Sequence, residues 1–260
     1  MASAPGARFA GMADEHRYRI HRPASQVQAE ARESILRYMQ DSPVPRDELL
    51  DQLPLFSSRH ALGRVFMMQA LYERILDVHG AVLVFGVRWG RDMAILQTLR
   101  AILEPNNTAR RIIGFDTFSG FPAVSDQDGG NQVGDFGVPP GYAQVLESIL
   151  HQRDVEDGNL YPRREIVEGD VVESLPRWLR EHPETVIAMA YFDMDLYEPT
   201  RAALDAIRPH VTRGTLVGFD EASHPLYPGE TVALREAWGL PDVRLQRTRF
   251  AGTPSFFVVE

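Results

Sequence analysis

The chain has 260 residues, 44% of them hydrophobic and 24% charged, with a net charge of −9 and neither cysteine nor lysine. This composition is that of a globular protein with one large domain and an extension, or with two small domains. The missing residue types exclude disulfides, thiolate zinc sites, cysteine nucleophiles, P-loop lysines and Schiff-base lysines. No segment has the roughly 20 apolar residues that span a bilayer, the N-terminus lacks the apolar core of a signal peptide, and no basic run suits nucleic acid. We therefore expect a cytoplasmic protein that binds neither membranes nor nucleic acid.

Residues 1–78 predict a helical extension that precedes the sheet. Between residues 23 and 40, apolar side chains recur with the spacing of one helix face, at Val27, Ala31, Ile35 and Met39. Three prolines then interrupt the pattern. A second helix is expected from about residue 59 to 77, with Leu62, Phe66, Gln69 or Ala70, and residues 71–76 facing inward. We expect this extension to cap the edge of the sheet or to form a subunit interface.

From residue 79 to the C-terminus, short apolar runs alternate with amphipathic helices, which is typical of a mostly parallel sheet covered on both faces. Strands are expected at 81–86, 110–116, 163–170, 185–193 and 214–221. Helices are expected at 91–103, 173–182, 199–211 and about 231–240. Two further strands, 242–250 and 254–260, have little room for a helix between them and predict an antiparallel hairpin. The predicted fold is therefore an α/β, Rossmann-like domain over residues 79–260, with a mostly parallel seven-stranded sheet and an antiparallel C-terminal strand.

One connection, from residue 119 to 161, is unusually long. It is rich in Gly, Pro and Asp, and it then carries a short helical pattern at 143–152. Connections of this length are usually either functional or disordered. We interpret this one as a lid insertion over a substrate, with disorder as the alternative.

Two glycines and two acids mark the ends of the first three strands. Gly86 and Gly90 bracket a strand-to-helix turn whose Gly-x-x-x-Gly spacing differs from the Gly-x-Gly-x-x-Gly of dinucleotide sites. Asp116 ends the second strand, where an acid can accept hydrogen bonds from ribose hydroxyls or cap a turn. Asp170 ends the third strand, where it can accept from an adenine amino group or cap the following helix. These positions suit a cofactor that contains a nucleoside.

Three more carboxylates follow the next two strands. Asp193 ends the fourth strand, and Asp220 and Glu221 end the fifth. If these strands are neighbours the acids converge, and converging anions repel one another unless a cation lies between them. With no cysteine and no His pair at zinc spacing, the expected cation is a hard divalent ion, Mg²⁺ or else Mn²⁺ or Ca²⁺. The alternative is that Asp220 and Glu221 cap the next helix.

Three polar residues nearby are given no catalytic role. Asp195 precedes the helix expected from residue 199 and is expected to cap or orient its loop. His151 and His224 could reach an acceptor, but a lone histidine in a loop is more often simply solvated.

The stretches FGVRWG, GFDTFSGFP, VEGDVVESLP, AYFDMDLYEPT and GTLVGFDE occur in this order and resemble the macrocin O-methyltransferase family, over roughly residue 82 to the C-terminus. The resemblance implies a class I methyltransferase fold, oligomers with helical N-terminal interfaces, S-adenosylmethionine as cofactor, a sugar hydroxyl as acceptor and a divalent metal, usually Mg²⁺. It implies cofactor contacts at Gly86, Val87, Arg88, Gly90, Asp116, Asp170 and Val171. It also implies Asp193 as the catalytic base, and Asp193, Asp220 and Glu221 as the metal ligands. Glu221 stands where the family commonly has Asp.

The function expected from this resemblance is metal-dependent methylation of a deoxysugar hydroxyl in antibiotic biosynthesis, carried out by a homo-oligomer. The acceptor is either a nucleotide sugar or a glycosylated natural product. A phenolic acceptor is a near alternative. A nicotinamide oxidoreductase and a non-enzymatic binding module are more distant ones, because the dinucleotide glycine motif is missing and the acids at the strand ends are intact.

Overall fold

A computed structural model describes residues 24–158 and 163–260. Its centre is a seven-stranded sheet with the order β3-β2-β1-β4-β5-β7-β6. The strands are β1 (Ala81–Phe85), β2 (Ile112–Asp116), β3 (Arg164–Glu168), β4 (Ile187–Phe192), β5 (Val211–Phe219), β6 (Gln246–Arg247) and β7 (Ser255–Val258). The first five strands pair in parallel, and β7 pairs antiparallel with both β5 and β6. The predicted fold class is confirmed, and β4 and β5 are neighbours as expected.

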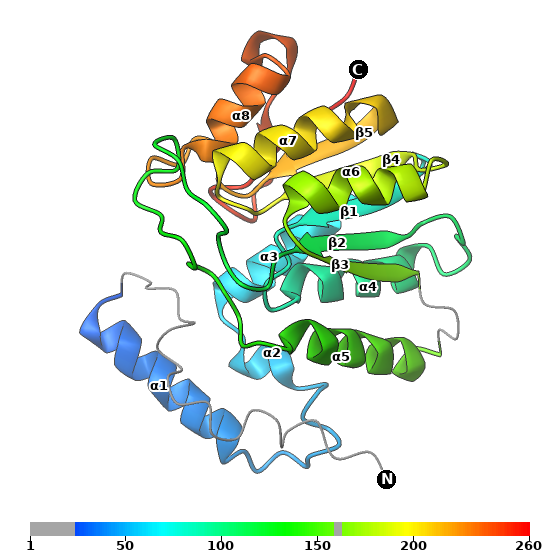
Figure 1. Cartoon of the computed structure of the whole chain (residues 1–260). Helices are drawn as coiled ribbons and strands as arrows, with labels where there is room; N and C mark the ends of the chain where they lie inside the picture. Colours follow the sequence, from blue (N-terminus) through cyan, green and yellow to red (C-terminus); the bar gives the residue numbers. More distant parts are fainter. Residues whose placement is uncertain (1–23, 159–162) are drawn as a thin grey trace.

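Helices cover both faces of the sheet (Figure 1). One face carries α3 (Arg59–Tyr72), α4 (Arg91–Leu103) and α5 (Tyr142–Glu156), and the other carries α6 (Val171–Glu181), α7 (Tyr197–Ile207) and α8 (Gly229–Ala237). Successive side chains of a strand point to opposite faces. Val82 and Val84 therefore join one hydrophobic cluster, whereas Leu83 and Phe85 join the other. This double burial explains why β1 is apolar at every position.

The helices of the N-terminal extension differ in what they bury. The extension contains α1 (Gln26–Gln40), the short α2 (Leu53–Phe56), α3 (Arg59–Tyr72) and a 3₁₀ turn, η3 (Glu73–Ile75). No residue of α1 is buried, and Figure 1 shows this helix lying away from the sheet. Helix α3, in contrast, shares a hydrophobic cluster with the strands. The boundary near residue 78 stays a prediction, and residues 1–23 lie outside the described chain.

The inward face of α3 is only partly the one expected. Phe66 is 48% exposed, and its ring centroid lies 5.6 Å from that of Phe250 in a tilted arrangement. The buried side chains are instead Arg64, Met67, Met68, Leu71 and Tyr72. Leu71, Tyr72 and Ile75 are thus buried as predicted, whereas Phe66 is not. The prediction missed the start of the buried stripe because that stripe begins with a charged residue.

The long connection after β2 passes the carboxyl ends of the strands as an irregular segment and then forms α5 (Figure 1). Asp128, which is 2% exposed, accepts hydrogen bonds from Ser125 N and from Tyr197 N at the start of α7, at 2.6 Å each. Helix α5 buries Ala143, Leu146, Leu150 and Asp154. The segment is therefore tied to the domain at both of these places, and residues 159–161 of the predicted insertion lie outside the described chain.

Candidate functional site

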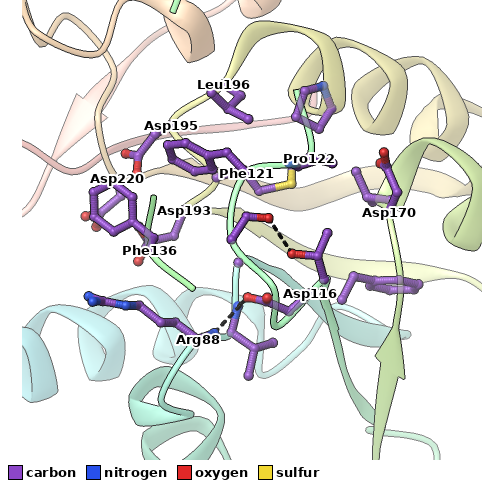
Figure 2. Close-up of a pocket in the computed structure, with 18 of the residues that line it drawn as sticks. Arg88, Asp116, Phe121, Pro122, Phe136, Asp170, Asp193, Asp195, Leu196 and Asp220 are labelled. Atoms are coloured by element: carbon purple, nitrogen blue, oxygen red, sulfur yellow. Dashed lines mark hydrogen bonds between the residues drawn. The ribbon is translucent and has the colours of Figure 1, made fainter. Parts of the chain in front are cut away.

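A cavity of about 410 Å³ opens at the carboxyl ends of β1, β2, β4 and β5. In an open parallel sheet, this edge is where ligands bind, close to the point at which the strand order reverses. Here the reversal lies between β1 and β4, which are neighbours in the sheet. Figure 2 shows Asp193, Asp195 and Asp220 gathered at one end of the cavity and Asp116 and Asp170 toward the other. We call these the acidic end, which includes Glu221, and the glycine-turn end, which includes residues 86–90.

Gly86 allows the glycine turn to lie directly beside the acidic end. Its φ is +89°, and a Cβ at this position would lie 1.8 Å from the carbonyl oxygen of Asp193. Gly90 has a φ of +84°, and a Cβ there would lie 2.2 Å from Leu146 of α5. Only glycine fits both demands, a left-handed backbone and a close neighbour. The absence of a side chain at Gly86 therefore allows the end of β4 to pack against the turn, and its absence at Gly90 allows α5 of the insertion to do so.

Asp116 binds the glycine turn through its carboxylate. Its Oδ2 accepts hydrogen bonds from the backbone N–H groups of Val87 at 2.6 Å and Arg88 at 2.8 Å, and its Oδ1 accepts one from Phe118 at 2.6 Å. Burial raises the pKa of Asp116, and these hydrogen bonds oppose that shift. The turn-capping role is present, and the carboxylate also lines the cavity, so the two predicted roles are compatible.

Asp170 has a similar double position. It is the N-cap of α6, and its side chain accepts a hydrogen bond from Val172 N at 3.0 Å. Gly169, Asp170 and Val171 also line the cavity. Six of the seven predicted cofactor contacts therefore line the cavity at the glycine-turn end. The seventh, Gly90, does not line it and is the N-cap of α4.

The acidic end brings Asp193, Asp220 and Glu221 to one cavity, but it does not group them around a cation. Within residues 24–158 and 163–260, no three His, Asp or Glu side chains are arranged as ligands of one metal ion. The reason is Arg64 of α3, whose guanidinium is ion-paired with both Asp193 and Asp220. The predicted Mg²⁺ site does not fit this arrangement.

Arg64 is the main functional residue that the sequence interpretation missed. The sequence does carry a signal for it, because Arg64, Met67, Met68 and Leu71 share the i, i+3, i+4, i+7 spacing of one helix face. A charged residue in an apolar stripe is costly unless it is paired at a specific site. Its partners are Asp92 on α4, Asp193 and Asp220.

Glu230 on α8 is a second residue that was missed. It is 0% exposed, and it accepts backbone N–H groups from both loops that carry acids. Its Oε1 lies 3.3 Å from Met194 N and 3.4 Å from Asp195 N, and its Oε2 lies 3.0 Å from Glu221 N. One carboxyl group therefore links the end of β4 to the end of β5.

Burial and mutual repulsion raise the pKa values of the carboxyl groups at the acidic end. Burial, and then the charge of Asp220, raise the pKa of Asp193 well above its usual range and that of Asp195 to about 7. The same two causes raise the pKa of Glu221 to about 8. Side chains with raised pKa values can accept a proton near neutral pH, which is the property of a general base.

Side chains of the insertion complete the cavity. Phe121, Pro122 and Phe136 line it, and the two phenylalanine rings lie 5.1 Å apart (Figure 2). Neither His151 nor His224 is among the lining residues. His151 is exposed on α5, and Nδ1 of His224 lies 3.8 Å from Oε2 of Glu221.

Comparison with known proteins agrees with this geometry. The family model described as macrocin O-methyltransferase (TylF) matches residues 22–231. A structure of CalS11, described as the calicheamicin methyltransferase, is 43% identical, covers 92% of this chain and 94% of its own, and superposes with a TM-score of 0.87. Its apo structure, described as TDP-rhamnose 3′-O-methyltransferase of calicheamicin biosynthesis, has 40% identity, 92% and 96% coverage and a TM-score of 0.80.

A more distant structure, the O-methyltransferase NovP, is 18% identical over 76% of this chain and 79% of its own, with a TM-score of 0.56, and it supports the fold alone. No curated protein gives a significant match. Since the family model covers most of the chain, the protein belongs to the macrocin O-methyltransferase family and is an S-adenosylmethionine-dependent O-methyltransferase.

Proposed function

We propose that this protein transfers the methyl group of S-adenosylmethionine to a hydroxyl of a deoxysugar in antibiotic biosynthesis. The sugar is carried either by a nucleotide or by a glycosylated natural product. The similarity to CalS11, described as a TDP-rhamnose 3′-O-methyltransferase, supports a sugar acceptor. The observation that carries the proposal is that one cavity joins the glycine-turn end to a buried acidic end. A methyl donor and a hydroxyl acceptor need this adjacency, because transfer requires both in line within one site.

The glycine-turn end is the proposed cofactor side. The turn at Gly86 leaves room for the amino-acid part of S-adenosylmethionine, and Asp116 would accept the ribose hydroxyls. Its oxygens already accept backbone N–H groups, but each carboxylate oxygen has capacity for a further hydrogen bond. Asp170 and Val171, which begin α6, would contact the adenine.

The acidic end is the proposed acceptor side, with Asp193 as the general base. A sugar hydroxyl is a poor nucleophile until a base removes its proton during the transfer. The side chain of Asp193 is 25% exposed, so an acceptor can reach it from the cavity. Burial raises its pKa, which favours proton acceptance, and Arg64 is paired with Asp220 as well as with Asp193.

The insertion is the proposed lid and acceptor wall. The rings of Phe121 and Phe136 give the cavity an apolar face, which suits a deoxysugar because its missing hydroxyls leave apolar surface. That the segment becomes more ordered when substrate binds stays a prediction. Hydrogen exchange with and without acceptor and S-adenosylhomocysteine tests it.

The homo-oligomer is supported by α1. This 15-residue helix has an N-terminal capping box and buries no residue, and Val27, Ile35, Leu36 and Tyr38 are exposed on it. Isolated helices of this length are only marginally stable in water, so we propose that a second copy of the chain covers this helix. Among the described residues no helix is long and apolar enough to cross a bilayer, and the cytoplasmic location and Mg²⁺ dependence stay predictions.

Mass spectrometry with S-adenosylmethionine labelled in its methyl group tests the proposed function. The acceptor panel should contain TDP-rhamnose, other TDP-deoxysugars, glycosylated natural products and a catechol. We expect one labelled methyl group on a deoxysugar hydroxyl. Methylation of the catechol alone would contradict the sugar assignment and support the phenolic alternative. Binding of the cofactor without turnover on any acceptor would support a binding module instead.

A further inference from the structure

Arg64 enters the acidic end from outside the sheet. Its side chain is 8% exposed and lies among the carboxylates of Asp92, Asp193 and Asp220. Nε donates to Oδ1 of Asp92 at 3.0 Å, and Nη2 donates to Oδ2 of Asp193 at 3.0 Å. Nη2 also donates to Oδ2 of Asp92, and Nη1 donates to Oδ1 of Asp220. One guanidinium thus contacts three carboxylates.

The neighbours of Arg64 fix its orientation. The phenol of Tyr191 donates to the same Oδ1 of Asp220 at 2.6 Å, and its ring lies 5.0 Å from Cζ of Arg64. Asp92, which is 5% exposed, receives two donors of the guanidinium in a fork. Paired donors of this kind fix geometry as well as charge. Arg64 is therefore built into the site.

The position of Arg64 conflicts with a metal ion. A divalent ion bound by Asp193 and Asp220 would have to lie between their carboxylates, and Mg²⁺ takes its oxygen ligands at about 2.0–2.1 Å. That position is held by the guanidinium, and two cations at such a distance repel each other strongly where water is scarce. Asp193 and Asp220 can therefore serve one of the two cations at a time.

We propose that Arg64 is the resident cation of the acidic end and competes with a divalent metal ion for Asp193 and Asp220. Because of this competition, the metal affinity of the chain depends on α3, which carries Arg64, as well as on the sheet. The proposal concerns metal binding in the absence of substrates, so it stands or fails separately from the proposed methyl transfer.

Metal titration of the protein without cofactor or acceptor tests the competition. Mn²⁺ binding, followed by electron paramagnetic resonance, is compared in the parent and in Arg64→Met. Removing the resident cation should tighten Mn²⁺ binding by at least about tenfold. Arg64→Lys should give an intermediate affinity, because an ammonium keeps the charge but cannot contact three carboxylates in a fork.

Arg91→Met is the matched control. Arg91 also pairs with Asp92, and its Nη2 lies 3.7 Å from Asp193, but its side chain is 51% exposed. Loss of this arginine should change Mn²⁺ affinity by less than about threefold, because solvent screens an exposed charge. Mn²⁺ binding in Arg64→Met that is no tighter than in the parent, or absent from both, would overturn the proposal.

A measurement on the parent protein decides the question if Arg64→Met does not fold. Phenylglyoxal modifies accessible arginines, and mass spectrometry locates the modified positions. Saturating Mn²⁺ should increase modification of Arg64 by at least about threefold, since displacement exposes it. Arg110, which is 1% exposed and bonded to Glu104 and backbone carbonyls, is the internal reference and should stay protected. If Mn²⁺ binds to the parent while Arg64 stays equally protected, the two cations do not compete. If the parent binds no Mn²⁺, the proposal requires that Arg64→Lys binds it.

Discussion

At the glycine-turn end of the cavity, carboxylates accept backbone N–H groups, whereas at the acidic end they face an arginine and one another. Asp116 and Asp170 each bind the turn or helix that follows a strand. Asp193 and Asp220 instead depend on Arg64, which lies 129 and 156 residues away along the chain. An acid that accepts backbone N–H groups has its charge stabilised by those hydrogen bonds, while a cluster of buried acids needs a cationic partner.

The largest effect on catalysis is expected from a substitution of Asp193 at the acidic end. Asp193→Asn removes the proposed base without changing side-chain size, so kcat should fall by about 10²–10⁴-fold. The affinity for S-adenosylmethionine, measured by calorimetry, should change by less than about threefold, because the cofactor lies at the other end. Asp205→Asn is the control, since Asp205 pairs only with surface groups on α7. A variant that keeps full kcat would exclude Asp193 as the base.

Asp116→Ala removes a carboxylate from the glycine-turn end. The variant loses the acceptor of three backbone hydrogen bonds as well as the proposed ribose contact. Affinity for S-adenosylmethionine should weaken by about 10–100-fold, while KM for the acceptor should change by less than about threefold. Calorimetry and initial rates measure the two quantities. Equal cofactor affinity in variant and parent would remove Asp116 from the cofactor site.

Glu230→Gln tests how the acidic end is held together. A glutamine has one acceptor oxygen, so the backbone N–H groups of either residues 194–195 or Glu221 lose their partner. The free energy of unfolding should fall by about 2–3 kcal/mol, the cost of a buried group left unpaired. Glu236→Gln is the control on the same helix, because Glu236 pairs with exposed Tyr197 and Arg201. Denaturant titration that shows equal stability for both variants would contradict this positioning role.

A pH dependence of stability is expected at Asp195. Its pKa of about 7 lies above the value of about 3.9 in an unfolded chain. Between these values the folded protein holds a proton that unfolding releases, so the free energy of unfolding falls as pH rises from about 4 to 7. Asp195→Asn lacks this slope, and between pH 4 and pH 8 it should gain up to about 4 kcal/mol relative to the parent, because each pKa unit corresponds to about 1.4 kcal/mol. Parallel slopes for parent and variant would show that Asp195 is ionised throughout.

Local patterns predicted most of the glycine-turn end. The apolar run of β1, its terminal Gly86 and the amphipathic α4 are adjacent in sequence, and the acid at Asp116 follows its own strand. Alternation of strands and helices also predicted the parallel sheet, because a crossover helix must follow each parallel strand. The strand predicted at 242–250 is shorter in the structure, where it is Gln246–Arg247, since a 3₁₀ turn at Leu240–Asp242 delays its start.

The sequence by itself determined that acids would end β2, β4 and β5, because strand length and polarity are local properties of the chain. Only the tertiary structure decided what those acids contact. Arg64 and Glu230 reach the acidic end from α3 and α8, helices that pack on opposite faces of the sheet. Which helix residue faces a given strand end depends on packing between segments far apart in sequence, and several hydrophobic registers satisfy the same apolar pattern. The fold therefore decides which cation lies between Asp193 and Asp220, although Arg64 and both acids can be read in the sequence.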